Sequence, residues 1–135
     1  MFFGARTKGL LGDLRIFSVV NYLEKFNIFE VGESKEGTKR SPLGFFLMHV
    51  NKFTERGNVV FLYYPPGSRN ELHSHGDLES IYYIAGGEGL VTIGEEKMLL
   101  RAGDVVFTPR NTKHQVVNSG KEMLIIFEVA IKVPQ

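Results

Sequence analysis

The sequence predicts an all-β protein: a jelly-roll barrel preceded by a short N-terminal extension. From residue 43 onward, short runs rich in Val, Ile, Phe and Tyr are separated by Gly, Pro, Asn and Asp residues, as is typical of strands joined by turns. A hydrophobic content of 43% and an aromatic content of 12% over 135 residues suit a single compact core. We therefore expect one barrel over residues 43–135 and an extension over residues 1–42.

The extension is expected to hold four segments in order. Residues 1–13 contain three glycines and predict a loosely held lead-in, whereas residues 14–20 are apolar and predict a strand. Asn21 is followed three residues later by Glu24, a pattern that favours a helix N-cap and one short helical turn. The polar, glycine-containing range 32–42 predicts a long mobile loop.

The barrel is expected to consist of short strands throughout. Their spacing indicates a sandwich or jelly roll rather than alternating strands and helices. The expected strands cover residues 43–50, 58–64, 72–75, 79–84, 89–93, 97–100, 104–108, 114–118 and 122–132.

Charge and cysteine content narrow the function classes. Sixteen basic and fifteen acidic residues leave a formal charge of +1, and the basic residues are scattered, so no nucleic-acid partner is expected. The absence of cysteine excludes disulfides, thiolate metal sites and a cysteine nucleophile. No apolar stretch reaches the length of a membrane span and no signal peptide is recognised, so no membrane partner and a cytoplasmic location are expected.

A first group of polar residues lies in the middle of the chain. His73 and His75 are separated by one residue, so on a strand both imidazoles would share a face and reach one ion. Glu79 then opens a strongly β-prone run, where its carboxylate would align with Ile81 and Tyr83. A carboxylate is an expected hard partner for imidazole ligands.

A second group follows about thirty residues later. His114 comes after a turn that begins at Pro109 and opens another alternating stretch, so it could enter the same site from a neighbouring strand. Three histidines and one glutamate leave positions open on an ion that prefers five or six ligands.

These two stretches resemble the cupin family. Gly67, His73, His75, Glu79 and Gly86 meet every fixed position of its first motif, and Gly103, Pro109, His114 and Asn118 meet its second. One position departs, because Asn111 stands where the family has glycine; asparagine tolerates left-handed backbone geometry best among other residues, so the turn should survive.

The resemblance implies the fold of a small single-domain cupin, a double-stranded β-helix. It also implies one divalent ion per subunit, Fe, Mn, Ni or Zn, held by His73, His75, Glu79 and His114. It points to a homodimer as well, and the apolar segment 16–20 is a candidate to cover a neighbour's sheet.

Other polar residues receive weaker assignments. Counting from an inward Glu79 places Tyr83 inside the barrel as a candidate catalytic residue, although a bulge would invert this phase and a core tyrosine is the commoner case. Asn118 is expected to hydrogen-bond a turn rather than to bind metal. His49 has no motif partner and is expected to have no chemistry. Arg69 and Arg110 could meet an anionic substrate or simply be exposed.

Two functions remain open at this point. The first is a metal-dependent enzyme of the oxygenase, isomerase or decarboxylase type, acting on a small polar metabolite bound at the metal. The second is a non-catalytic module in which the metal gates the binding of a small ligand. The fold alone does not choose between them.

Overall fold

The computed structural model describes residues 25–30, 38–49 and 55–134, and in these ranges it confirms the all-β expectation. No helix in the described ranges is long and apolar enough to cross a membrane. The strands are β1 (Thr38–Arg40), β2 (Phe46–His49), β3 (Gly57–Tyr64), β4 (Leu78–Gly86), β5 (Glu88–Ile93), β6 (Glu96–Arg101), β7 (Val105–Thr108), β8 (His114–Val117) and β9 (Leu124–Lys132).

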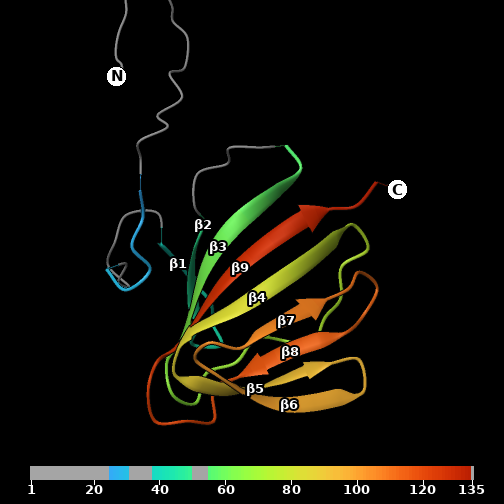
Figure 1. The fold of residues 1–135 in the computed structure, drawn as a ribbon. Coiled ribbons are helices and arrows are strands. Elements are labelled where there is room, and N and C mark those ends of the chain that lie inside the picture. Colours follow the sequence, from blue (N-terminus) through green and yellow to red (C-terminus); the bar gives the residue numbers. More distant parts are fainter. Residues whose placement is uncertain (1–24, 31–37, 50–54, 135) are drawn as a thin grey trace, which may run out of the picture.

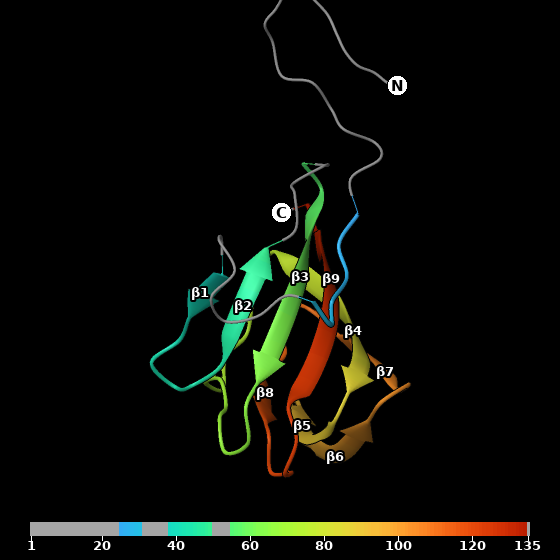
Figure 2. The ribbon, with the colours of Figure 1, turned by 90° about the vertical axis from the view of Figure 1, so that its left-hand side faces the viewer.

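The strands form two antiparallel sheets. A six-stranded sheet has the order β1-β2-β3-β9-β4-β7, and a three-stranded sheet has the order β6-β5-β8. In Figure 1 the larger sheet lies above the smaller one. Figure 2, seen from the side, shows the last strand of the chain, β9, between β3 and β4. Strands from opposite ends of the barrel sequence therefore lie together, as in a jelly roll.

The main hydrophobic core lies between the two sheets. Because successive side chains of a strand point to opposite faces, β3, β4 and β9 of the larger sheet contribute alternate residues to this core. The buried members are Val60, Leu62, Tyr64, Tyr82, Ile84, Val91, Leu100, Val116, Leu124 and Ile126.

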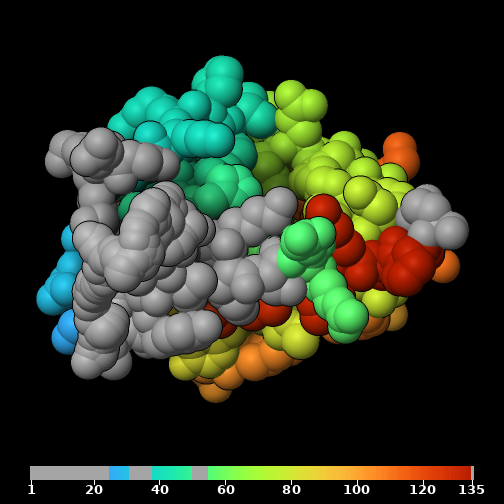
Figure 3. All heavy atoms as spheres, turned by 90° about the horizontal axis from the view of Figure 1, so that it is seen from above, coloured from blue at the N-terminus to red at the C-terminus, as the bar shows by residue number. Residues whose placement is uncertain are grey.

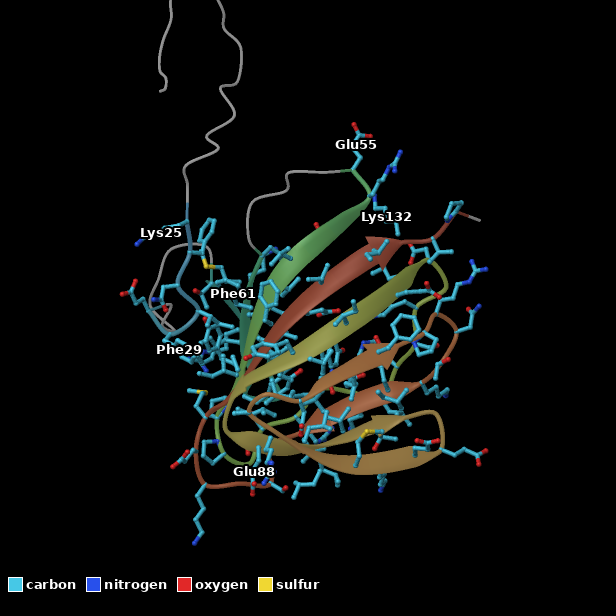
Figure 4. The ribbon with its side chains drawn as sticks, viewed as in Figure 1. Lys25, Phe29, Glu55, Phe61, Glu88 and Lys132 are labelled. Carbon is cyan, nitrogen blue, oxygen red and sulfur yellow. The ribbon has the colours of Figure 1, made fainter. Side chains whose placement is uncertain are left out.

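A second apolar cluster covers the outer face of the larger sheet. Phe46, Met48, Phe61 and Tyr63 are buried there, and the segment 25–30 packs on them through Phe26 and Ile28. The Phe26 and Phe61 rings meet edge to face, with centroids 6.4 Å apart. Figure 4 shows Phe61 on β3 next to this segment. The Tyr63 hydroxyl donates a hydrogen bond of 2.6 Å to the carbonyl oxygen of Ile28.

The start of β3 and the end of β9 are joined at one end of the barrel. The backbone N–H of Lys132 donates a 2.6 Å hydrogen bond to the carbonyl oxygen of Arg56. Figure 3 shows these two segments side by side, and Figure 4 places Glu55 and Lys132 at this end and Glu88 at the opposite end. The long β3 and β9 thus run the full height of the sheet.

Two expected elements differ in the structure. Residues 72–75 are not a strand: only His73 forms an isolated β-bridge, to His114, and the flanking residues are irregular. Part of the expected loop, Thr38–Arg40, is a strand that pairs with β2. The predicted strand 14–20 and the helical turn after it lie outside the described residues.

The side chain of Asn118 is fully buried and ties three backbone segments together. Its amide donates to the carbonyl oxygens of Tyr64 and Glu122, at 2.6 Å and 2.7 Å, and its Oδ1 accepts from the N–H of Gly120 at 2.8 Å. Both amide hydrogens and the oxygen are therefore satisfied. The interpretation of Asn118 as a structural residue is confirmed.

Asn111 has a left-handed backbone, as the sequence predicted for this turn. Its φ is 60°, and it is the only residue other than glycine with a positive φ among those the structure describes. Left-handed geometry costs an ordinary residue about 1–2 kcal/mol. We therefore expect the Asn111→Ala variant to unfold with a free energy about 1–2 kcal/mol lower than that of Asn111→Gly, measured by urea denaturation.

The Asn111→Gly variant serves as the control, because glycine adopts this geometry without steric cost. It should retain the stability of the unchanged chain. Equal stability of the two variants would show that the left-handed turn is not a constraint.

Candidate metal centre

The three motif histidines come from two segments that are held together by their backbones. His73 and His75 lie in the connection between β3 and β4, and His114 is the first residue of β8. The N–H of His73 donates to the carbonyl oxygen of His114 at 3.1 Å, and the N–H of His114 donates to that of His73 at 2.8 Å. The N–H of Asn111 donates to the carbonyl oxygen of His75 at 2.6 Å.

These bonds bring the three imidazole rings together. One ligand nitrogen from each ring lies within 4.8 Å of the others. The ring centroids of His73 and His114 are 4.4 Å apart, those of His73 and His75 4.8 Å, and those of His75 and His114 5.4 Å. The three nitrogens can therefore bind one ion without a backbone rearrangement.

Hydrogen bonds fix which nitrogen of two rings is available. The Nδ1 atom of His73 lies 2.6 Å from the carbonyl oxygen of Glu71, and that of His114 lies 3.0 Å from the carbonyl oxygen of Thr112. A carbonyl oxygen can only accept, so each Nδ1 carries the hydrogen and each Nε2 keeps its lone pair. Such orientation through the second ring nitrogen is usual for histidine ligands of metals.

The surroundings favour the neutral, metal-binding form of the imidazoles. Burial lowers the pKa of His75, and the neighbouring His73 lowers it further, whereas Asp77 opposes this. Burial also lowers the pKa of His114, against the hydrogen bond to Thr112, which raises it, and His73 and His75 lower it further. A cluster of like-charged imidazolium groups is therefore unfavourable, and the donor set fits a divalent transition-metal ion.

The structure does not bring Glu79 into this group. In β4 the buried residues are Ser80, Tyr82 and Ile84, so Glu79 shares the outward phase of Ile81 and Tyr83. The alignment of Glu79 with Ile81 and Tyr83 is as expected, but this face is the outer one. Ligation by Glu79 stays a prediction, and the strand phase argues against it.

The expectation that Tyr83 faces the interior is wrong. Tyr83 is 44% exposed and lies over the outer apolar cluster, whereas its neighbour Tyr82 is 3% exposed and faces the inside. The physical reason is the bend between His75 and Glu79, which sets the phase of β4 one residue away from that assumed. Tyr82 thus takes the interior position, with its ring 6.4 Å from that of His114.

A cavity of about 520 Å³ lies beside His73 and His75, on the inner face of the larger sheet. His49 lines it, although no sequence motif indicated this, and burial lowers the pKa of His49. Neither Arg69 nor Arg110 is among the described residues that line it. Its walls are partly apolar and partly polar, and include Leu43, Phe45, Leu47, Asn58, Val60, Leu62, Tyr64, Asn70, Glu71, Leu78, Tyr82, Glu128 and Ala130.

Glu128 is a site residue that the sequence analysis missed. It lies on β9 directly opposite Tyr82 and faces the cavity, and its Oε2 accepts a 2.6 Å hydrogen bond from the Ser80 hydroxyl. Burial raises the pKa of Glu128, against the hydrogen bond from Ser80 and the charge of His73. The available signal was one carboxylate in the inward phase of an otherwise apolar strand, between Ile126 and Ala130.

Comparison with known proteins agrees with this architecture. The family model described as "Cupin domain" matches residues 60–130, which is more than half of the chain. A crystal structure of a predicted oxalate decarboxylase from Thermotoga maritima is similar with a TM-score of 0.69 and 26% identity, over 76% of this chain and 98% of that one.

Two curated relatives match over a shorter stretch. An uncharacterized protein of Methanocaldococcus jannaschii is 42% identical over 62 residues, which cover 46% of this chain and 50% of the relative. A protein of Thermotoga maritima named "Oxalate-binding protein" is 39% identical over 67 residues, which cover 50% of this chain and 55% of the relative. The chain thus spans about half the length of the curated relatives it matches.

The arrangement predicts one divalent ion per chain. Replacing two of the three imidazoles, in a His73→Ala/His75→Ala variant, should weaken metal binding by more than about tenfold, as measured by elemental analysis after dialysis. Binding in the unchanged protein should be complete above pH 7 and fall below about pH 6.5, because protons compete for imidazole. Since the pKa values of His75 and His114 are lowered, release should require more acid than free imidazole does.

The matched control is Glu79→Gln, which removes a carboxylate that faces away from the three histidines. Its metal affinity should equal that of the unchanged chain. A loss comparable to that of the double histidine variant would instead return Glu79 to the ligand set.

Proposed function

This chain belongs to the cupin family, and from that premise we propose that it is a metal-dependent enzyme acting on a small polar molecule in the cavity beside His73, His75 and His114. The cavity has room for a metabolite-sized ligand, and two of the three imidazoles line it. One observation carries the proposal: three imidazoles converge within 4.8 Å, and two of them, those of His73 and His75, line the cavity.

The metal would be held by His73, His75 and His114, and it would supply a Lewis acid that polarises an oxygen of the bound molecule. The remaining groups are those of the chain itself. The side chains of Phe45, Leu47 and Leu62 give the cavity part of its apolar wall. The family includes oxygenases, isomerases and decarboxylases, so the reaction type stays within these classes.

Glu128 supports the enzyme over a passive binding site. Its carboxyl group faces the cavity, and burial raises its pKa, so it can hold or release a proton at Oε1 or Oε2 closer to neutral pH than an exposed glutamate. Perturbed carboxylates in clefts are frequent at active sites. Glu128 therefore replaces Tyr83 as the candidate proton-transfer group.

The alternative is a non-catalytic module that binds a small ligand at the metal. The relative named "Oxalate-binding protein" favours this reading, because its name describes binding and no reaction. The two functions share one site and differ only in whether the bound molecule is changed.

Turnover measured beside binding distinguishes the two functions. Protein purified without a metal-chelating tag is analysed for Fe, Mn, Ni and Zn, and then incubated with oxalate, 2-oxo acids and sugars while NMR follows the compounds. We expect metal-dependent conversion of at least one compound, absent in His73→Ala/His75→Ala and reduced at least about tenfold in Glu128→Gln. Binding without conversion would establish the alternative.

We further propose that the protein is a homodimer formed through the outer face of the larger sheet. Ile81 and Tyr83 of β4 and Val105 and Phe107 of β7 are exposed there, and they pair across the two strands as Ile81 with Phe107 and Tyr83 with Val105. These four exposed side chains are apolar or aromatic, and Glu79 follows in the same outward phase at the start of β4, so the complement of the patch is mainly apolar. A second copy of the same face provides such a complement around a two-fold axis.

A dimer has twice the 15.2 kDa mass of one chain, which light scattering measures directly. A Phe107→Glu variant should shift the mass toward the monomer, because it places a carboxylate in the interface. The control is Leu99→Glu, which alters a similarly exposed apolar residue on β6 of the other sheet and should leave the mass unchanged. A monomer mass for the unchanged chain at micromolar concentration would refute the proposal.

A further inference from the structure

Two buried tyrosine hydroxyls in the cavity have no hydrogen-bond partner in the described part of the chain. Tyr64 and Tyr82 are 1% and 3% exposed, and both line the cavity. The hydrogen bonds described for residues 25–30, 38–49 and 55–134 do not include either hydroxyl. Because a buried hydroxyl without a partner is unfavourable, these two groups fit a site that is completed by a bound molecule or by water.

Glu128 lies opposite Tyr82 in the sheet and lines the same cavity as both phenols. Its charge acts on both phenols, and burial together with this charge raises the pKa of Tyr64 and of Tyr82. The carboxylate accepts one hydrogen bond, from Ser80 to Oε2, which leaves Oε1 without a bond to any described residue. The cluster comes from the inner faces of β3, β4 and β9, which are adjacent in the larger sheet. Strands position such groups more rigidly than loops do.

The charges that line the cavity have one sign. Glu71 and Glu128 are the acidic members, and no lysine or arginine occurs among the described residues of the lining. A ligand carboxylate that reached Glu128 would therefore meet a like charge without a compensating cation, which opposes binding. A hydroxyl group at the same place would donate a hydrogen bond to the carboxylate and could accept one from a phenol, and an ammonium group would donate to the carboxylate and to a phenol oxygen.

We propose that Tyr64, Tyr82 and Glu128 recognise the end of the ligand that is not bound to the metal. The ligand class that fits is a small hydroxy acid or amino acid: a carboxylate for the metal at one end and a hydrogen-bond donor at the other. A dicarboxylate of the same length is disfavoured. This inference rests on the proposed function, because it places the first end of the ligand at the metal.

The test uses the metal-loaded full-length chain and ligands matched in length. Succinate is compared with 4-hydroxybutanoate and 4-aminobutanoate, and malonate with 3-hydroxypropanoate and 3-aminopropanoate, by titration calorimetry. At the chain length that fits, the hydroxy or amino compound should bind about tenfold to a hundredfold more tightly than the dicarboxylate, the range expected for a hydrogen bond to a charged group.

Three variants assign this preference to the cluster. Tyr82→Phe should lower the affinity for the hydroxy and amino compounds, and Glu128→Gln should raise the affinity for the dicarboxylate. Both variants should therefore reduce the difference in affinity between the two classes of ligand. Tyr83→Phe removes the hydroxyl of the neighbouring residue on the outer face and should change neither affinity. Metal content, measured on every sample, shows that each variant keeps its fold and its ion.

The outcomes separate this inference from the proposed function. Three results obtained at full metal occupancy would overturn the inference alone. The affinities could be equal at both chain lengths, or the dicarboxylates could bind more tightly. The third result is a preference that Tyr82→Phe and Glu128→Gln leave unchanged. Full occupancy without measurable binding of any of these compounds also overturns it. An unchanged chain that takes up no divalent metal overturns the proposed function, and this inference falls with it.

Discussion

The backbone pairing between residues 67–75 and residues 111–118 is the constraint on which the site depends. At one end the N–H of Gly67 donates to the carbonyl oxygen of Asn118, and at the other the N–H of Asn111 donates to that of His75. The reciprocal bonds between His73 and His114 lie between these ends. An irregular segment without such bonds would leave its histidines free to separate, whereas here each imidazole starts from a fixed backbone position.

The larger sheet separates two surfaces of opposite character. Along β9, Ile126 lies in the core between the sheets and Glu128 lines the cavity, whereas Phe127 and Val129 face the outer apolar cluster. A shift of one residue would exchange these faces and bury a carboxylate among aromatic rings. The long ladder between β3 and β9, unbroken from Gly57 to Tyr64, fixes the register against such a shift. The same ladder thus protects the apolar face and places Glu128 in the cavity.

The sequence was sufficient for the histidines but not for the groups around them. His73, His75 and His114 stand at spacings that fix a shared site, and Asn111 and Asn118 have side chains suited to the turn and to the buried junction that they occupy. The sequence analysis placed Tyr83 on the wrong face of β4. Which residues of this strand face inward depends on the geometry of the preceding bend, and tertiary contacts decide that geometry.

Glu128 shows a different limit of sequence analysis. Its hydrogen-bond partner Ser80 is 48 residues away, and its approach to the cavity follows only from the insertion of β9 between β3 and β4. A single acidic residue in an apolar strand is equally compatible with an exposed position or a bulge. Contacts between strands that are distant in the sequence decide which position the residue takes, and the local pattern does not.

Charge balance links the two halves of the cavity. Three neutral imidazoles give a divalent ion no negative charge, so the ion would bring two positive charges into a partly apolar space. Those charges would favour the ionised form of Glu128 and oppose the rise in its pKa that burial causes. The carboxylate of Glu128 and one carboxylate of the ligand then balance the ion, whereas Glu71, the other acidic residue of the lining, is exposed to water. A second ligand carboxylate would exceed this balance where no lysine or arginine lines the described part of the cavity. The electrostatics and the hydrogen-bonding groups therefore favour the same ligands, those with a single carboxylate.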